Sequence, residues 1–543
     1  MVNCYINVND YTEGIMKKIL SLLLVLFVCL FVGCSSGLKE SGIMNKDDAE
    51  FDANDGVAEN MGVPGIDAEV DVNDVVEENM GVPGIGGEKP DVSGEKYTEI
   101  KENCFVSTSV NNKSFFTLDS NTASYANLRR YINNGIKLNK NIIKTDELIN
   151  YFSYSFNDVE EGKTFGISAQ MMDCPWNDGN KLVTVGVSTK HEVVDDSKGN
   201  NLVFLIDVSG SMYNSNKLPL LKQAFPMMLD KLNENDLISI VTYASGVKVV
   251  LEACRVKEKA TIINAIESLQ AGGSTNGEKG LELAYNVASS CFIEGGNNRI
   301  LLATDGDFNV GIYNSQDLMK YISEKRDSGI YLSVLGVGMG NYRDDITETL
   351  AKNGNGNSFY IDSIEEAKKV LCEDLNSVLL TVAKDVKAQV IFNEKLVESY
   401  RLIGYENKII TEEDFNDENK DAGEIGSGHQ TVVVYEVKLK EDNAEENEVF
   451  NVTLNYKDPK SDKSYSEVYR YDKKYIGDAV SDDYKFVACL VEFSLILRDS
   501  EYKGQANFNS VIERLESLEG IKDDKYKSEF IELIKKAIEN ELV

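Results

Sequence analysis

Apolar and polar residues follow two different periodicities along this chain, and each predicts a different kind of element. Between about 199 and 384, short apolar runs predict buried strands, and stretches with helical periodicity lie between them. The strands are predicted at 202–206, 237–243, 300–303, 332–337 and 358–361, and the helices at 257–269, 278–292, 315–326 and 364–382. Such alternation is typical of a mostly parallel sheet with helices on both faces. We therefore expect a doubly wound α/β domain in the centre of the chain.

On both sides of this central part, apolar and polar residues alternate one by one, which predicts β-strands. These strands are expected within 165–194 before the centre, and at 386–392, 431–439, 450–456 and 465–471 after it. We expect the strands of the two sides to join in one β-sandwich, with the α/β domain inserted into it. Residues 484–498 and those from 509 onward predict amphipathic C-terminal helices.

A chain of 543 residues is too long for one ordinary domain. The patterns suggest six parts: 1–34, 35–103, 104–198, 199–384, 385–480 and 481–543. The second part is acidic and poor in aromatic residues, which predicts a disordered tether. It repeats the string Glu-Asn-Met-Gly-Val-Pro-Gly-Ile at 59–66 and 78–85, either as a spacer with Pro-Gly turns or as a peptide motif for a partner.

The first 34 residues predict export. Lys17 and Lys18 precede the apolar run 19–32, which is too short for an ordinary membrane span and is typical of a secretory signal. The end of the run, Phe-Val-Gly-Cys34, resembles a bacterial lipobox, which implies that Cys34 carries lipid. An uncleaved anchor is the other interpretation. Both place the rest of the chain at the cell membrane, on its extracytoplasmic face.

Charge and residue counts exclude several functions. The net charge of −34 argues against nucleic acid and anionic membrane surfaces as partners, because both select for Lys and Arg. The chain has only two histidines, His191 and His429, too few for a histidine metal cluster. No C-x-x-C pair occurs among its cysteines, which argues against zinc, and we interpret Cys291 and Cys372 as buried thiols.

Hydroxyl and carboxylate residues gather where predicted strands end. Five of them stand in three segments: Asp207, Ser209, Ser211, Thr275 and Asp305. Gly210 lets the backbone bend so that the first three face one point, and Thr275 lies on a glycine-rich loop. All five offer hard oxygen atoms of the kind that a small divalent cation prefers. The alternative is that Asp207 and its serines cap the next helix.

The order Asp-x-Ser-x-Ser, then Thr, then Asp resembles the metal-ion-dependent adhesion site of von Willebrand factor type A domains. The resemblance implies that Ser209, Ser211 and Thr275 bind Mg²⁺ directly or nearly so, with Mn²⁺ or Ca²⁺ as substitutes. It implies that Asp207 and Asp305 hold the ion directly or through water, and that an Asp or Glu carboxylate of a protein partner fills an open position. Further strings between about 114 and 530 resemble bacterial lipoproteins with such a domain, in their N-terminal and C-terminal regions.

We therefore expect a surface-tethered lipoprotein that binds a protein partner and is not an enzyme. The loops 213–217, 273–277 and 307–313 are expected to line the binding surface. One alternative is a metal-independent scaffold or assembly factor at the membrane. A metal-dependent hydrolase with Asp207 as nucleophile is less favoured, because Ser209 stands where such enzymes carry a second acid and no histidine base is near in sequence.

Overall fold

The structure is a computed structural model that describes residues 90–119, 121–191, 199–306, 308, 315–440, 446–459, 461–476 and 479–543. The chain divides into two compact units, Met1–Val82 and Pro83–Val543, and every described residue belongs to the second. The predicted signal peptide, Cys34 and both copies of the repeat lie outside the described residues. So do Asp307 and residues 309–313 of the third predicted binding loop.

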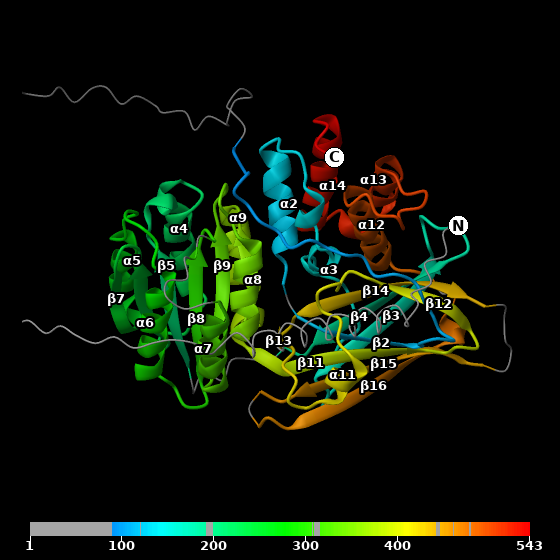
Figure 1. The fold of residues 1–543 in the computed structure, drawn as a ribbon, viewed down its shortest axis with the longest axis horizontal. Coiled ribbons are helices and arrows are strands. Elements are labelled where there is room, and N and C mark those ends of the chain that lie inside the picture. The colour runs from blue at the N-terminus through cyan, green and yellow to red at the C-terminus, as the bar shows by residue number, and fades with distance from the viewer. Residues whose placement is uncertain are drawn as a thin grey trace, which may run out of the picture. The chain divides into compact units, whose positions relative to one another are not determined.

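The central domain is built on one six-stranded sheet in the order β10-β9-β8-β5-β6-β7. All neighbours pair in parallel except β6 and β7. The strands are β5 (Asn200–Asp207), β6 (Leu237–Tyr243), β7 (Val247–Arg255), β8 (Asn297–Thr304), β9 (Ile330–Val337) and β10 (Ser358–Ile361). Figure 1 shows this sheet in green, with helices on both of its faces.

Helices cover the two faces because residues of each strand point alternately to opposite sides. In β5, Leu202, Phe204 and Ile206 join one apolar core, while Val203 and Leu205 join the other. The helices are α4 (Leu218–Leu229), α5 (Lys259–Glu267), α6 (Gly277–Ser290), α7 (Ser315–Asp327), α8 (Asp344–Asn353), α9 (Ile364–Lys368) and α10 (Leu375–Leu379). The predicted parallel α/β domain is confirmed.

The end of this domain differs from the prediction of one helix over 364–382. The helix α9 passes into a π-helical turn, Lys369–Glu373, and then into the short α10, which ends at Leu379. Thr381 already begins a strand, where it lies opposite Gly426 of a neighbouring strand. Thr381 and Val382 are β-branched, so sheet pairing outweighs the helical periodicity here.

Two antiparallel sheets form the sandwich, and each combines strands from before and after the central domain. One has the order β1-β12-β14-β4-β3; the other has β13-β11-β15-β16, with β2 paired to β11. The early strands are β1 (Val106–Ser107), β2 (Lys113–Thr117), β3 (Phe165–Asp173) and β4 (Lys181–Thr189). The late strands are β11 (Thr381–Phe392), β12 (Val397–Ile403), β13 (Gly423–Gly426), β14 (Gln430–Leu439), β15 (Glu448–Lys457) and β16 (Ser464–Asp472). Residues of both sheets share one apolar core, which confirms the predicted insertion of the α/β domain into a sandwich.

Helices from the two ends of this unit pack together. They are α2 (Ala123–Asn133), α3 (Thr145–Asn150), α12 (Asp482–Leu497), α13 (Phe508–Ser517) and α14 (Lys525–Glu539), and they share a further core; the short α11 (Glu412–Asn416) lies apart from it, against β2 and β11. Figure 1 shows α2 and α3 beside the red C-terminal helices. In the described part of the chain, no helix combines the length and the apolar character that a membrane crossing requires. The predicted C-terminal helical segment is confirmed.

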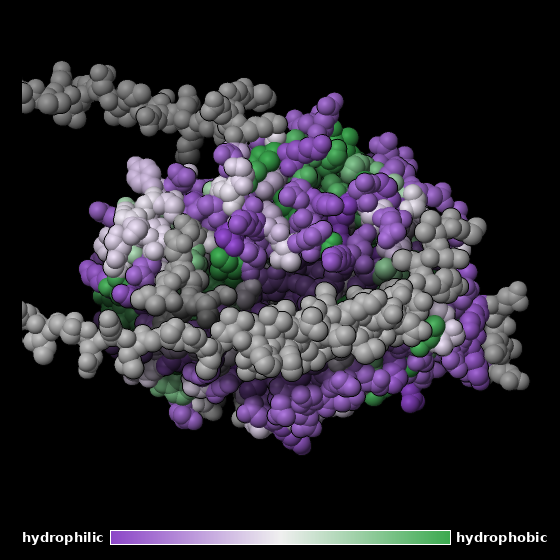
Figure 2. All heavy atoms as spheres, viewed as in Figure 1, coloured by the Kyte–Doolittle hydropathy of each residue, from purple (hydrophilic) through white to green (hydrophobic). Residues whose placement is uncertain are grey.

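The surface agrees with the acidic composition. The face shown in Figure 2 is mostly hydrophilic. The six cysteines of the described part are all free thiols there, and Cys291 and Cys372 are half-buried.

Candidate metal site

Asp207 is the last residue of β5 and is completely buried. Its Oδ1 accepts a hydrogen bond of 2.8 Å from the Ser209 amide. Its Oδ2 is buried and has no hydrogen-bond partner of normal geometry among the described residues. Burial raises the pKa of Asp207 to about 6, although hydrogen bonds from Ser209 and Tyr243 act in the opposite direction. A buried carboxylate oxygen that lacks a donor fits a bound cation.

The two serines after Asp207 lie side by side. Their Oγ atoms are 3.0 Å apart; Ser209 is buried, whereas Ser211 is exposed. Ser209 is the N-terminal cap of the 3₁₀ helix Gly210–Tyr213, and Ser211 lies in its first turn. The turn therefore presents two hydroxyls next to the buried carboxylate, and one of them reaches solvent.

Backbone hydrogen bonds join this turn to the loop that carries Thr275. The Gly210 amide donates to the Gly273 carbonyl over 2.9 Å, and the Gly272 amide donates to the Val208 carbonyl over 2.8 Å. A side chain at Gly210 would crowd this junction, because an added Cβ would lie 3.3 Å from the Gly273 oxygen. Thr275 is half-buried, two residues before α6 begins. The junction fixes the Thr275 loop against the Asp207 turn.

Asp305 follows β8 and is also completely buried. Its Oδ2 accepts a hydrogen bond of 2.9 Å from Nζ of Lys217, a lysine that is itself 3% exposed. Lys217 Nζ also donates to Oδ1 of Asn341 over 3.1 Å. Burial acts to raise the pKa of Asp305, but Lys217, together with hydrogen bonds from Ser211 and Asn341, lowers it below its ordinary value. The two acids of the site thus have pKa values shifted in opposite directions.

Four of the five predicted ligands, Asp207, Ser209, Ser211 and Asp305, meet at the end of the sheet. Thr275 lies on the adjoining loop. The alternative that Asp207 and its serines cap the next helix is wrong. The next helix is the 3₁₀ helix Gly210–Tyr213, and its N-terminal cap, Ser209, makes no capping hydrogen bond through its side chain; the following helix, α4, begins only at Leu218, with Lys217 as its cap.

Sequence reasoning missed Asn341, and it wrongly placed Lys217 on the binding surface with the rest of the loop 213–217, whereas Lys217 is buried against Asp305. The hint in the sequence was the position of Lys217 directly before the apolar run of α4. A lysine that faced solvent at this position would have no evident role. In the described part of the chain, no cluster of three or more His, Cys, Asp and Glu residues could hold a metal ion. The oxygen donors here are two carboxylates and hydroxyls, which fit a hard cation such as Mg²⁺.

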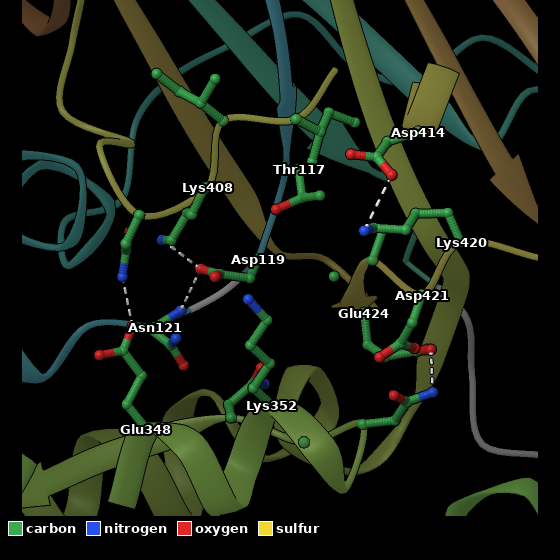
Figure 3. A pocket seen from close by; sticks show the side chains of 18 residues that line it. Thr117, Asp119, Asn121, Glu348, Lys352, Lys408, Asp414, Lys420, Asp421 and Glu424 are labelled. Atoms are coloured by element: carbon green, nitrogen blue, oxygen red, sulfur yellow. Dashed lines mark hydrogen bonds and ion pairs between the residues drawn. The ribbon is translucent and has the colours of Figure 1, made fainter. Parts of the chain in front are cut away.

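A separate cavity of about 420 Å³ lies between the central domain and the sandwich, and none of the five predicted ligands lines it. Figure 3 shows Lys352 reaching into it from α8. Ion pairs close much of its wall: Lys408 contacts Asp119 at 2.7 Å, and Lys420 contacts Asp414 at 3.0 Å. Two of the three lysines in its lining, Lys408 and Lys420, are therefore paired with acids of the same lining.

Glu424, in the wall of this cavity, is the basis of a pH-dependent prediction. It is 7% exposed, and burial together with Asp385 raises its pKa well above its ordinary value. Because the pKa is higher in the folded protein, Glu424 favours folding at low pH, and this contribution is lost as the pH rises. We expect Glu424→Gln to raise the free energy of unfolding by about 1–3 kcal/mol at pH 8. Urea unfolding at pH 8 and at pH 4.5 measures this, and the gain should shrink at the lower pH.

The contacts of Glu424 also predict that Glu424→Gln raises the free energy of unfolding. Its Oε1 accepts a hydrogen bond of 2.7 Å from Asn355 Nδ2, while Glu424 Oε2 and Asn355 Oδ1 are buried without partners among the described residues. A glutamine supplies an N–H donor beside that Asn355 oxygen. If Glu424→Gln raised the free energy of unfolding equally at pH 8 and at pH 4.5, the negative charge of Glu424 would not be the cause.

A parallel sheet whose strand ends bring Asp-x-Ser-x-Ser together with a second acid defines a von Willebrand factor type A domain. The family model of that description, "von Willebrand factor type A domain", matches residues 201–372. The model "von Willebrand factor" matches 91–184, and "Uncharacterized protein YfbK, C-terminal" matches 377–539. The chain is 36% identical over 466 residues to the uncharacterized protein YfbK of Escherichia coli K12, which covers 81% of each chain. It belongs to the YfbK family of von Willebrand factor type A domain proteins.

Other similarities are confined to part of the chain. Inter-alpha-trypsin inhibitor heavy chain H2 of Mus musculus is 27% identical over 195 residues, which cover 34% of this chain and 20% of that one. Among solved structures, a von Willebrand factor type A protein from Catenulispora acidiphila aligns with a TM-score of 0.38 and 15% identity, covering 62% of this chain and 80% of that one. Domains of this class generally serve protein interaction, adhesion or scaffolding and not catalysis.

Proposed function

We propose that this protein is a surface-tethered lipoprotein that binds a protein partner through a Mg²⁺ ion at its type A domain. The ion is held by five side chains: Asp207, Ser209, Ser211, Thr275 and Asp305. A carboxylate of an Asp or Glu residue of the partner completes its coordination. The observation that carries this proposal is the buried carboxylate of Asp207, whose Oδ2 has no hydrogen bond of normal geometry among the described residues and which precedes a turn with two adjacent hydroxyls.

The charges at the site support a divalent cation followed by an anionic partner group. Asp207 and Asp305 bring two negative charges, and Lys217 brings one positive charge. The side chains alone thus carry one net negative charge, and Mg²⁺ would change this to one net positive charge. Because the site is buried, such a charge attracts a carboxylate more strongly than it would in water.

The loops around the site are suited to contact with a protein. Neither residues 208–216 nor residues 270–277 include an Asp, Glu, Lys or Arg, although 27% of the whole chain is charged. Tyr213, at the end of the serine turn, is 78% exposed. Uncharged loops do not repel an acidic partner group, and an exposed aromatic side chain supplies contact area beyond the single coordinated carboxylate.

The location that we propose for the protein rests on Cys34. Lipid on this cysteine, after cleavage of the predicted signal peptide, would hold the type A domain at the extracytoplasmic face of the cell membrane. Mn²⁺ or Ca²⁺ would substitute for Mg²⁺ with the same oxygen donors. A metal-independent scaffold at the membrane is the second candidate. It is favoured by the sandwich and the terminal helices, which extend far beyond the type A domain.

A hydrolase is less well supported. Hydrolysis needs a general base near the attacking water. Both histidines of the chain, His191 and His429, line a different pocket, whose lining does not include Asp207. At the metal site, the Lys217 ammonium is already paired with Asp305.

Capture of a partner tests the proposed function. The purified full chain is incubated with native envelope and extracellular extracts in Mg²⁺ and in EDTA, alongside Asp207→Ala. We expect a partner that is retained only by the wild type in Mg²⁺ and is released when EDTA is added. Asp173→Ala is the matched control, because Asp173 is an exposed acid whose only described ion pair is with Lys181.

The outcomes separate the two candidate functions. A partner that Asp173→Ala retains and Asp207→Ala loses supports recognition through the metal. A partner that is retained in Mg²⁺, in EDTA and by Asp207→Ala supports the scaffold instead, with its binding surface outside the metal site.

A further inference from the structure

Residues 91–97, here called the strap, lie along the loop 338–343 that follows β9. The Lys96 amide donates to the Tyr342 carbonyl over 3.1 Å, and the Asp344 amide donates to the Lys96 carbonyl over 3.2 Å. Gly94 is in such close contact that a Cβ there would overlap the carbonyl oxygen of Gly340. The predicted tether was expected to extend to 103, but its last residues are docked on the type A domain.

Glu95 anchors the strap with a fully satisfied carboxylate. Its side chain is 1% exposed and accepts hydrogen bonds from Arg130 at 2.8 and 2.7 Å. The hydroxyls of Tyr97 and Tyr131 donate to it over 2.7 and 2.9 Å, and the Gly340 amide donates over 2.9 Å. Burial acts to raise the pKa of Glu95, but Arg130 and the Gly340 amide keep it below its ordinary value. One ionised side chain thus ties α2, the strap and the loop together.

The other side of the same loop faces the metal site. Asn341 accepts a hydrogen bond of 3.1 Å from Lys217, which in turn donates 2.9 Å to Asp305. Gly306, the residue after Asp305, packs on the loop so closely that an added Cβ would lie 3.2 Å from the Tyr342 backbone. The loop 338–343 is therefore held between Glu95 of the strap and the Asp305 turn.

We propose that the strap positions the metal site: Glu95 holds the loop 338–343, and through Asn341 and Lys217 this loop holds Asp305. Release of the strap then lowers the affinity for the divalent cation. The strap belongs to the C-terminal end of the segment that was predicted to be a disordered tether. This inference rests on the proposed function, because it concerns the same ion. Glu95 acts as a positioning residue, since it does not touch any of the five predicted ligands.

The physical reason lies in how ligands are held. A carboxylate that binds a metal ion depends on the groups that orient it, and their loss costs about tenfold or more in metal affinity. Asp305 is oriented by Lys217 and Asn341, and the position of Asn341 depends on a loop whose Gly340 amide is bonded to Glu95. Without the strap, this loop and the first residue of α8 lose two backbone hydrogen bonds to Lys96, and the loop also loses the bond from the Gly340 amide to the buried Glu95 carboxylate.

The test uses Gly94→Ala in the full chain, because the added methyl group separates the strap from Gly340 without removing a charge. Gly246→Ala is the matched control, since a Cβ at Gly246 meets nothing within 4 Å. Glu95→Gln is the second variant, and hydrogen exchange of the strap amides reports whether the strap is released. Calorimetry with Mn²⁺ should give a dissociation constant about tenfold higher in the released variant.

A second measurement follows Lys217 without any metal. Lys217 is 3% exposed, so acetic anhydride in EDTA should modify it slowly in the wild type and about tenfold faster once the strap is released. Lys527 is 4% exposed and pairs with Asp483 at 2.6 Å, so its labelling reports global unfolding. Faster labelling of Lys217 alone supports the proposal, and equal gains at both lysines count against it.

The two measurements distinguish this inference from the proposed function. If the wild type does not bind Mn²⁺, the proposed function fails, while Lys217 labelling still reports on the link to the strap. The link itself is refuted if strap amides exchange faster but Lys217 labelling is unchanged. The link is also refuted if neither Gly94→Ala nor Glu95→Gln releases the strap. In that case the contacts of these two residues would not be what holds the strap.

Discussion

Asp207→Asn is expected to raise the free energy of unfolding of the metal-free protein at pH 8 by at most about 3 kcal/mol. Asp305→Asn is expected to lower it by about 3 kcal/mol under the same conditions. Both variants should lose binding of Mg²⁺. Two acids of one site thus have opposite effects on stability and the same effect on the metal.

The sign for Asp207 follows from its burial. The folded protein holds the pKa of Asp207 at about 6, above its ordinary value of 3.8. A raised pKa means that Asp207 favours the folded state at low pH, and that this contribution is lost as the pH rises through about 6. Above that pH, the wild type has a buried negative charge without a counterion, and asparagine removes it. The advantage of Asp207→Asn should therefore disappear near pH 4.

For Asp305→Asn, the expected change in the free energy of unfolding has the opposite sign. Its pKa lies below the ordinary value, so its contribution to stability is present at neutral pH and is lost as the pH falls through the folded value. Asparagine at this position leaves the buried ammonium of Lys217 without a carboxylate. An unpaired buried charge lowers the free energy of unfolding. The difference between Asp305→Asn and the wild type should become smaller in acid only because the wild type itself is less stable there.

Urea unfolding in EDTA at pH 8 and at pH 4.5 measures both effects. Adding Mg²⁺ should then raise the midpoint of the wild type and of the Asp173→Asn control, but not of either site variant. A loss of stability in both variants, of the same size and at both pH values, would show that the site is structural and that its acids have no separate electrostatic roles.

The metal site shows which features the sequence could predict. Asp207, Ser209 and Ser211 stand within five residues at the end of an apolar run, so their meeting depends only on local structure. Asp305 follows β8, which pairs in parallel with β5, and parallel neighbours bring their carboxyl ends to the same edge. Lys217 and Asn341 are 124 residues apart and meet through tertiary packing, for which no periodicity exists.

The strap shows why another part was missed. Residues 91–97 belong to an acidic stretch with few apolar residues, which is the composition of a disordered segment. Glu95 looks like any other acid of that stretch. Its burial is decided by Arg130 and Tyr131 of α2 and by Gly340 of the type A domain. Ion pairing with distant residues thus fixes a segment that its own composition leaves unspecified.

Edge elements were missed for a related reason. The strand β7 lies at the edge of the parallel sheet and is half-buried or exposed except at Cys254, and Lys248 and Glu252 interrupt its apolar residues, so these do not form the continuous buried run that revealed its neighbours. The helix α8 is short and rich in acids and threonines. By contrast, the sandwich strands β11, β14 and β15 each bury one or both faces, and their patterns were sufficient to predict them.

Arg129→Ala is expected to lower the free energy of unfolding by about 3–5 kcal/mol. Arg129 lies on α2, its side chain is 4% exposed, and it binds acids from two other parts of the protein. It donates 2.8 Å to Asp362, which follows β10, and 2.7 Å to Glu366 of α9. A third bond of 3.1 Å reaches Glu529 of α14. One guanidinium thus joins the N-terminal helices, the type A domain and the C-terminal helices.

The size of this effect comes from what the substitution leaves behind. The side chains of Asp362 and Glu366 are 6% and 3% exposed, and without Arg129 both carboxylates would be buried with much less compensation. Arg129→Lys should recover only part of the loss, because an ammonium cannot reproduce the fork of donors that reaches three acids. The loss should also loosen the type A domain from the helices that hold it, because these ion pairs cross that boundary.

Urea unfolding followed by circular dichroism measures the loss, and hydrogen exchange shows where it acts. The control is Arg470→Ala, because Arg470 is 71% exposed and pairs with Glu448 at 3.1 Å. An exposed pair of this kind contributes little to stability. Exchange should increase at α2, α9 and α14 in Arg129→Ala and remain unchanged in β5. An effect no larger than that of Arg470→Ala would mean that the ion pairs of Arg129 contribute nothing measurable to holding the type A domain against the terminal helices.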